Sequence, residues 1–339
     1  MRSGRHFLLI VFLALTAIAF NSQNAVSQIL YGRWKSEDEH RFGTVNSLTG
    51  DLTTIATIPR TSSFGISTFS NALDPAKSTL YFAAIDSSDW LYSVNMKTES
   101  VTRVLIDNVT FMWLEFDHIS EVLYGRWKSE DEHHFGTVDP DTGELTTIAA
   151  IPRSSSFGIA SASNTLDPLN SILYFSANDS SNWLYSVNME TGSVDRVSTD
   201  DVSLMWLEFD PISEVLYGRW KSEDEHRFGT VDPDTGELTT IATIPRSPSF
   251  GIASASNTLN PLNSTLYFGA NDSSNWLYSV NMETGSVRKV LTDDALYWLE
   301  VPEPCGLAFL TLGAVTVLRK REYRCLCGTV SWPDLTPTS

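Results

Sequence analysis

The chain has 339 residues and a formal net charge of −18, with its acidic residues concentrated between residues 28 and 301. A region this acidic repels nucleic acid and anionic membranes, so we expect its partners to be cations, cationic polymers, neutral glycans or other proteins. Its three cysteines, Cys305, Cys325 and Cys327, all follow this region, which excludes a fold held by disulfides.

The N-terminus predicts export. Residues 1–27 join a basic start to an apolar run over residues 7–20 and end in the small-residue sequence Ala25-Val26-Ser27. This order is typical of a secretory signal peptide, and the apolar run is shorter than the roughly 20 residues of a membrane-spanning helix. We therefore predict that residues 1–27 are a signal peptide and that the mature chain begins at Gln28.

Internal repetition dominates the rest of the sequence. The phrase LYGRWKSEDEH recurs with a period of 93 residues, starting at Leu30, Leu123 and Leu216. A related LYF phrase follows 50 residues after each start, so every repeat divides into two halves of similar pattern. A half of about 45 residues is the usual length of a four-stranded propeller blade.

Each half contains four short segments rich in aromatic and β-branched residues. In the first half of the second repeat, this composition predicts strands over residues 112–116, 122–127, 134–138 and 145–151. The sequence Asp139-Pro140-Asp141-Thr142-Gly143 separates the last two with turn chemistry, although its Asp-x-Asp-x-Gly spacing also resembles part of a calcium loop. We interpret it as a β-turn. Residues 28–301 show no helical period.

The two ends of the repeat region complement each other. A Trp-Leu-Glu segment precedes the second and third Leu-Tyr phrases, at Trp113 and Trp206, and a third segment at Trp298 has no phrase after it. The first phrase, at Leu30, has no such segment before it. We predict that residues 28–301 form an all-β, six-bladed β-propeller of three double-blade repeats, in which residues 296–301 pair with the strand at Leu30 and close the ring.

The C-terminal region has a recognisable order. Val301, Pro302, Glu303 and Pro304 lead into an apolar run over residues 305–318, which ends at the basic cluster of Arg319, Lys320 and Arg321. Residues 302–321 resemble a PEP-CTERM sorting signal. The resemblance implies an exosortase-type processing enzyme as partner, transient membrane contact through residues 305–318, and a bacterial cell-surface or extracellular-matrix location. An ordinary C-terminal membrane anchor is the alternative.

The residues that follow depart from that pattern, since such sorting signals usually end soon after the basic cluster. Residues 322–339 are expected to form a disordered tail. The repeats themselves resemble those of bacterial surface propellers, through the phrases Phe209-Asp210-Pro211, Leu216-Tyr217 and Val231-Asp232-Pro233-Asp234-Thr235-Gly236. These phrases define blades and imply no activity.

An acidic Ser-Glu-Asp-Glu-His loop occurs in every repeat, predicted to join the second and third strands of alternate blades. The arginine that precedes each following inner strand is expected on the same face. Carboxylates there can bind a divalent cation or a cationic or glycan partner, and a solvated hairpin is the alternative. No cofactor is expected beyond that candidate cation. The candidate ligand-binding residues are Asp38, Glu39, His40, Asp131, Glu132, His133, Asp224, Glu225, His226, Arg60, Arg153 and Arg246.

Nine tryptophans recur at fixed blade positions and are predicted to pack between blades. Those beside the acidic loops, Trp34, Trp127 and Trp220, are the candidates for exposure. On the inner strands, Glu115, Glu208 and Glu300 are predicted to line the central channel. The neighbouring strand offers Arg33, Arg126 and Arg219 as their ion-pair partners.

No catalytic motif is present, since the repeats contain no GxSxG, HExxH, phosphate-binding glycine loop or cysteine. Three equal copies of each candidate site favour binding over catalysis. The sequence therefore predicts an exported, non-catalytic binding or scaffold protein. The alternative is an extracellular polysaccharide hydrolase or lyase that uses the channel glutamates.

Overall fold

The structure, a computed structural model, describes residues 28–60, 64–86, 88–106, 109–153, 157–246 and 250–301. Within these ranges the chain is all-β, and no helix long and apolar enough to cross a membrane is found there. The predicted signal peptide, the sorting residues after Val301 and the tail lie outside the described residues.

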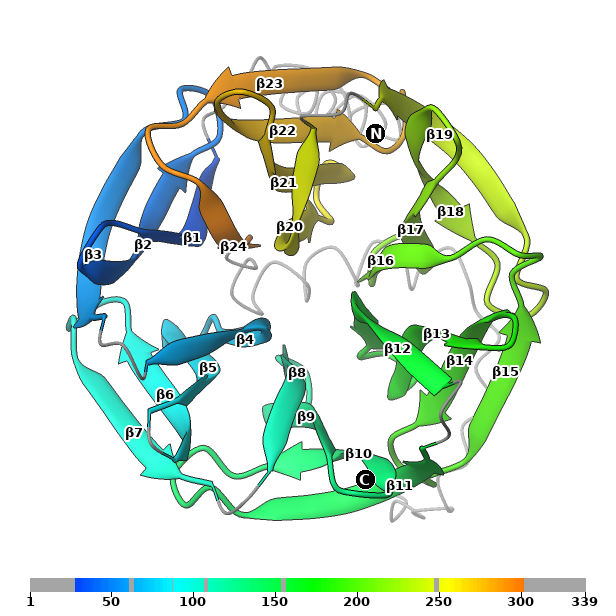
Figure 1. Ribbon diagram of the computed structural model, residues 1–339, viewed down its shortest axis with the longest axis horizontal. Coiled ribbons are helices and arrows are strands. Elements are labelled where there is room, and N and C mark those ends of the chain that lie inside the picture. The colour runs from blue at the N-terminus through cyan, green and yellow to red at the C-terminus, as the bar shows by residue number, and fades with distance from the viewer. Residues whose placement is uncertain are drawn as a thin grey trace, which may run out of the picture. The chain divides into compact units, whose positions relative to one another are not determined.

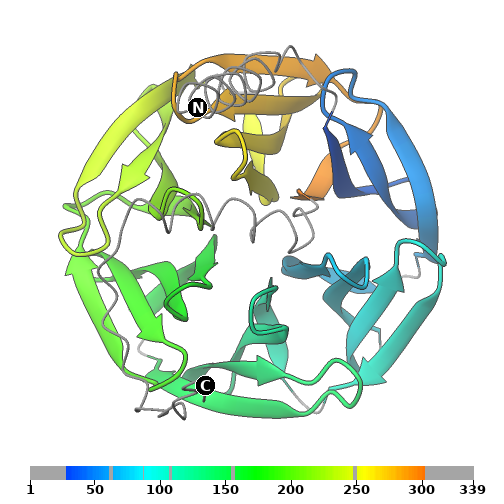
Figure 2. The same cartoon turned by 180° about the vertical axis from the view of Figure 1, so that it is seen from behind.

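The strands of the described residues form six antiparallel groups of four, set side by side around a common centre (Figures 1 and 2). The first group is β24 (Leu296–Glu300), β1 (Ile29–Lys35), β2 (Glu39–Asn46) and β3 (Leu52–Pro59). The second is β4 (Gly65–Asp74), β5 (Thr79–Ile85), β6 (Asp89–Asn95) and β7 (Val101–Leu105). A single parallel bridge, Ser70 to Leu114, links this group to the third.

The remaining groups repeat the same order. The third is β8 (Thr110–Asp117), β9 (Val122–Lys128), β10 (Glu132–Val138) and β11 (Leu145–Pro152), and the fourth is β12 (Phe157–Asp167), β13 (Ile172–Asp179), β14 (Asn182–Asn188) and β15 (Val194–Ser198). The fifth is β16 (Leu204–Asp210), β17 (Val215–Lys221), β18 (Glu225–Val231) and β19 (Leu238–Pro245). The sixth is β20 (Gly251–Asn260), β21 (Thr265–Asn271), β22 (Asn275–Asn281) and β23 (Val287–Leu291).

The two ends of the described chain share one sheet. Strand β24 pairs antiparallel with β1, with Glu300 opposite Tyr31 and Trp298 opposite Arg33, before a bulge shifts the register. The amide of Val301 then donates to Thr258 Oγ1 of the sixth group at 3.1 Å. The strand pairing that the sequence predicts between residues 296–301 and the strand at Leu30 is therefore present.

The hydrophobic core lies between the groups and not within any one of them. Six clusters of buried side chains occur in the described chain, each shared by two neighbouring groups. In one of them Phe135 of β10 stacks on Phe175 of β13 at 5.0 Å between ring centroids, and Phe175 stacks on Tyr185 at 4.9 Å. Full burial of such a side chain contributes about 1.5–3 kcal/mol, so these contacts between groups hold the assembly together.

The structure differs from the prediction of which tryptophans are exposed. The tryptophans beside the acidic loops are buried, with exposures of 1 % for Trp34 and 4 % for Trp127 and Trp220. The prediction that they are exposed is wrong, because each indole lies over a glycine of the next strand, as Trp127 does over Gly136. The half-buried tryptophans are instead Trp90, Trp183 and Trp276.

The Asp-x-Asp-x-Gly segment is a turn, as interpreted from the sequence. Gly143 has φ of 78° and its amide donates to the carbonyl of Asp139 at 2.8 Å. The Asp139 carboxylate accepts the amides of Asp141 at 2.8 Å and Thr142 at 3.0 Å, and these bonds lower its pKa. Its oxygens therefore stabilise the turn itself.

The close approach at Gly136 gives a stability prediction. A methyl group added there would lie 1.9 Å from the carbonyl oxygen of Thr146 and 3.0 Å from Trp127, whereas at Gly158 it would meet no atom of the described residues within 4 Å. We expect Gly136→Ala to lower the free energy of unfolding by about 1–3 kcal/mol or more, because the backbone must move. Gly158→Ala should be nearly neutral, as measured by urea unfolding. Equal effects of the two variants would contradict the packing described.

Candidate functional site

The acidic loops lie where the sequence predicts, between the second and third strands of alternate groups. They are short: in the third group only residues 129–131 separate β9 from β10, and the amide of Ser129 donates to the carbonyl of Glu132 at 2.9 Å. The two acidic residues at each loop tip are exposed. They are Glu37 and Asp38, Glu130 and Asp131, and Glu223 and Asp224.

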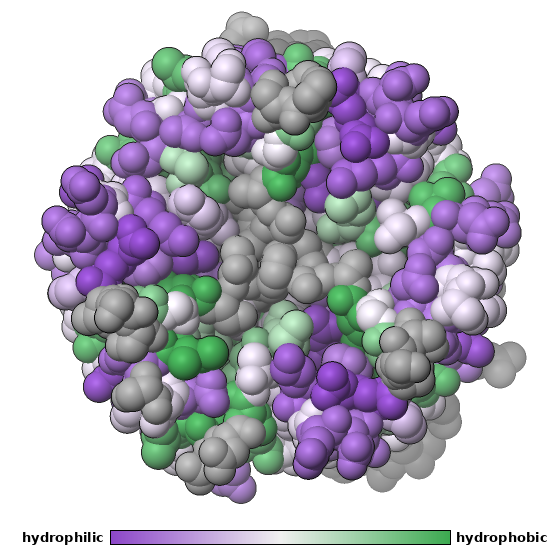
Figure 3. Space-filling model, in the orientation of Figure 1, coloured by the Kyte–Doolittle hydropathy of each residue, from purple (hydrophilic) through white to green (hydrophobic). Residues whose placement is uncertain are grey.

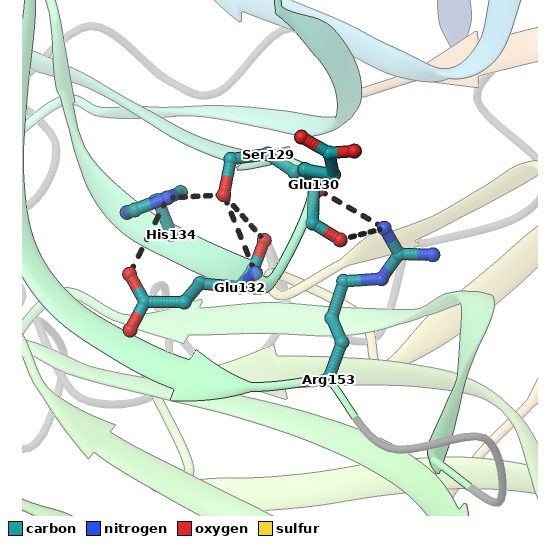
Figure 4. Close-up of polar contacts among 5 residues, drawn as sticks. All are labelled: Ser129, Glu130, Glu132, His134 and Arg153. Carbon is teal, nitrogen blue, oxygen red and sulfur yellow. Dashed lines mark hydrogen bonds and ion pairs between the residues drawn. The ribbon is translucent and has the colours of Figure 1, made fainter.

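An arginine fixes each loop, but through the backbone and not through the carboxylates. Arg153 Nη1 donates to the carbonyls of Ser129 at 3.0 Å and Glu130 at 2.9 Å (Figure 4). The backbone amide of Arg153 donates to the carbonyl of Asp131 at 2.8 Å. The guanidinium groups of Arg60 and Arg246 make the same contacts at 3.1–3.2 Å, and their amides donate to the carbonyls of Asp38 and Asp224 at 2.8 Å. The predicted proximity of arginine and loop is therefore present, and its effect is to hold the exposed carboxylates in a defined place.

The glutamates that end the loops lie in the strands and contact a neighbour two residues ahead. Glu39 lies 3.4 Å from Arg41, and Glu225 lies 3.4 Å from Arg227. In the second repeat His134 takes the place of the arginine: its Nε2 lies 3.8 Å from Glu132 and 3.0 Å from Ser129 Oγ (Figure 4). Such half-exposed ion pairs contribute at most about 1 kcal/mol.

The histidines do not belong to the exposed loops, contrary to the sequence prediction. His40, His133 and His226 are 3 %, 8 % and 4 % exposed, because alternation along the strand turns them toward the neighbouring group. There each packs on a half-buried phenylalanine, as His133 does on Phe157 at 5.5 Å. Burial, and then nearby arginine and lysine side chains, lowers the pKa of each to about 4, so the imidazoles are neutral at pH 7.

Among the described residues, no group of three or more histidine, cysteine, aspartate or glutamate side chains lies close enough together to hold a metal ion.

The three glutamates predicted to line a central channel lie around one cavity. Glu115, Glu208 and Glu300 line one cavity of about 150 Å³, together with residues of the innermost strands of all six groups. One carboxylate also bridges two groups, since Glu115 Oε1 accepts the amide of Leu166 in β12 at 3.1 Å. Three carboxylates in one cavity can bind a cationic or hydroxyl-bearing group or act in acid–base chemistry.

The predicted ion pairs between these glutamates and the arginines of the neighbouring strand are wrong. Arg126 lies opposite Trp113, and Glu115 lies opposite Tyr124. The guanidinium nitrogens Nε, Nη1 and Nη2 of Arg126 are all buried without a hydrogen-bond partner among the described residues, so this arginine does not pair with Glu115. The arginines concerned, Arg33, Arg126 and Arg219, are at most 1 % exposed and lie between the groups.

Sequence reasoning missed a second repeated surface feature, on the groups without acidic loops. Arg103 lies over the Trp90 ring at 4.1 Å, and its Nη1 donates to the Tyr92 hydroxyl at 2.9 Å and lies 3.2 Å from Asp86. Arg196 over Trp183, at 4.3 Å, and Lys289 over Trp276, at 4.2 Å, repeat the stacking. A Trp-Leu-Tyr phrase followed by a basic residue eleven positions after its tyrosine is the signal that reveals these cation–π pairs.

The acidic loops and the cation–π pairs both contribute to the molecular surface. Figure 3 shows hydrophilic residues over most of the face in view, with hydrophobic residues scattered between them. On the described chain, three acidic loops thus alternate with three aromatic–basic pairs from one group to the next.

Comparisons with known proteins agree on the fold. The model of a repeat family of unknown function, DUF6923, matches residues 14–165. TolB from Acinetobacter baumannii is similar at a TM-score of 0.58 and 11 % identity, over 81 % of this chain and 65 % of that chain, so the chain spans less than two thirds of that protein. No curated protein matches the sequence.

Two further solved structures are similar. A putative TolB from Agrobacterium tumefaciens has a TM-score of 0.57 and 11 % identity, over 82 % of this chain and 96 % of that chain. A chain of a nidogen/laminin complex has a TM-score of 0.54 and 10 % identity, over 81 % and 98 %. At such identities the likeness establishes a propeller-type fold alone.

The contacts of Arg153 predict a local effect on its loop. Arg153→Gln removes both guanidinium bonds to the loop carbonyls, so amide hydrogen exchange in residues 129–132 should accelerate, with a change in global stability of about 1 kcal/mol or less. Arg196→Gln, a change of the same kind on the next group, should leave that exchange unchanged. Unaltered exchange in Arg153→Gln would show that the arginine does not hold the loop.

The buried histidines predict a dependence of stability on pH. Because the pKa of His133 falls from its ordinary value of 6.5 to about 4 in the folded chain, the unfolded chain binds a proton that the folded chain does not between those pH values. The stabilisation is therefore complete above pH 6.5 and is lost as the pH falls toward 4, by up to about 3 kcal/mol per histidine. Urea unfolding should show that the free energy of unfolding falls less between pH 7 and pH 5 in His133→Gln than in the wild type. Equal losses would contradict this.

Proposed function

We propose that the protein is an exported, non-catalytic propeller of the bacterial cell surface or extracellular matrix, which binds a glycan or protein through the face that carries the acidic loops. The order of features in residues 1–27 and 302–321 supports export and handling by an exosortase-type enzyme, with transient membrane contact through residues 305–318.

We further propose that the six groups of strands are the six blades of a closed ring over residues 28–301. Support comes from the pairing of β24 with β1 and from the buried cluster that joins Leu30 and Leu299 to Tyr267 and Leu277 of the sixth group. A closed ring leaves no inner edge strand open to pairing with other chains.

The observation that carries the binding function is the threefold presentation of one fixed loop. Each loop tip holds two exposed acidic residues, and each is held by an arginine that bonds two backbone carbonyls. A held loop loses less conformational entropy on binding than a mobile one. Three such sites on one ring allow weak contacts to combine on an extended partner.

The charge of the chain limits the chemical classes of partner that this face can bind. With a net charge of −18 and acidic loop tips, the face favours cationic groups or the hydroxyl groups of a neutral glycan. A repeating polymer suits a threefold face, because successive units can contact successive loops. The half-buried tryptophans Trp90, Trp183 and Trp276 lie on the intervening groups and add aromatic surface.

A glycan array of neutral and cationic polysaccharides tests the proposal. We expect the triple variant Asp38→Asn/Asp131→Asn/Asp224→Asn to lose at least about tenfold in apparent affinity, because the three contacts act together. The matched control is Asp51→Asn/Glu144→Gln/Glu237→Gln, which removes the same charge from exposed acidic residues at the opposite ends of the strands. Equal losses in both variants, or none in the first, would refute the loop site.

One observation favours a second function, an extracellular polysaccharide hydrolase or lyase. Glu115, Glu208 and Glu300 share a single cavity, where carboxylates can act as acid and base. Polysaccharide turnover by the purified chain that disappears in Glu115→Gln, Glu208→Gln or Glu300→Gln would favour the enzyme. Turnover that is absent from the wild type leaves binding as the function.

A further inference from the structure

The sheet surface beneath each acidic loop is basic. In the third group Arg126 lies opposite Phe135, and Lys128 lies opposite His133, so all four share one face of the sheet. Arg126, Lys128 and Arg153 all act electrostatically on His133. The same set recurs in the other repeats, as Arg33, Lys35, His40 and Arg60, and as Arg219, Lys221, His226 and Arg246. These are the three basic clusters.

The arginine at the base of each cluster is enclosed. Arg126 is 0 % exposed, and within the described chain its Nε, Nη1 and Nη2 all have no hydrogen-bond partner. Arg33 and Arg219 are each 1 % exposed, and their Nε atoms have no partner either. The Nδ1 atoms of His40, His133 and His226 are likewise buried without a partner. Each cluster therefore holds buried, unpartnered nitrogens of two different side chains on the same face of one sheet.

Such an arrangement is costly unless something compensates the charge. Burial lowers the pKa of Arg126 to about 9, so the guanidinium is still protonated at neutral pH. An isolated buried charge is penalised by several kcal/mol, and a guanidinium offers five N–H donors that require acceptors. Among the described residues, no carboxylate contributes to the electrostatics of Arg126 or His133, and the described charges that act on His133 are all positive.

We propose that each basic cluster holds one small monovalent anion, such as chloride, between the arginine guanidinium and the Nδ1–H of the histidine. Burial of both side chains limits the ligand to this size, since a polymer cannot reach an arginine that is 0 % exposed. The anion accepts the unmet hydrogen bonds and neutralises the charge, which a water molecule does not. Three related anions would then form part of the packing between groups, whatever partner the outer face binds.

Thermal unfolding of the full chain tests the proposal. At equal ionic strength, chloride should raise the Tm above that in gluconate, an anion too large for the clusters, by roughly 2–4 °C. The triple variant Arg33→Met/Arg126→Met/Arg219→Met should lose this difference. The matched control, Arg103→Met/Arg196→Met/Lys289→Met, removes equal charge from the cation–π pairs and should keep it. No chloride effect in the wild type, or an effect that persists in the first variant, would overturn the proposal.

A second measurement needs no variant and so does not depend on the folding of one. Crystals of the wild-type chain soaked in bromide should show anomalous scattering peaks within contact distance of the Arg33, Arg126 and Arg219 guanidinium groups. Peaks at these three places support the anion sites. Their absence there, with bromide bound only elsewhere, would overturn them.

Discussion

Burial of the middle strands on both faces is the constraint on which the rest of this structure depends. In β9 the five consecutive residues from Leu123 to Trp127 are all buried, because one face of the sheet packs on the group before it and the other on the group after it. A four-stranded group cannot bury both of its faces alone, so each depends on its two neighbours. The Phe135–Phe175–Tyr185 stack and its equivalents supply those contacts.

The same constraint explains why strands from the two ends of the described chain share one sheet, and why the acidic loops have a fixed position. Placing β24 beside β1 completes a group with strands from both ends of the described chain, and the core contacts of Leu30 and Leu299 follow from it. The loops at the strand ends then emerge from a rigid frame. Arg153 and its equivalents donate hydrogen bonds to backbone carbonyls of each loop, and these bonds restrict the movement of the loop that carries the exposed carboxylates. In the proposed binding role, loops held in this way lose little conformational entropy when a partner binds.

Charge is layered in each repeat, with carboxylates at the loop tips and cations beneath them. The exposed Glu130 and Asp131 face solvent, while Arg126 is enclosed between two groups. Our two proposals assign different ligands to the two layers: a polymer with cationic or hydroxyl groups to the outer layer, and a small anion to the inner layer. Since the pKa of His133 is depressed partly by Arg126, the inner layer also links stability to pH.

Strand positions, the acidic loops, the Asp139 turn and the pairing of residues 296–301 with the first strand were all predictable from the sequence, because they follow from local turn chemistry and from the phase of an exact repeat. Tertiary structure alone decided which side chains are enclosed. It buried His133 and Trp127, left Trp90 half-buried, and enclosed Arg126 without a hydrogen-bond partner among the described residues. Alternation along a strand shows which residues share a face, but where both faces are covered, only the neighbouring groups determine what each face meets.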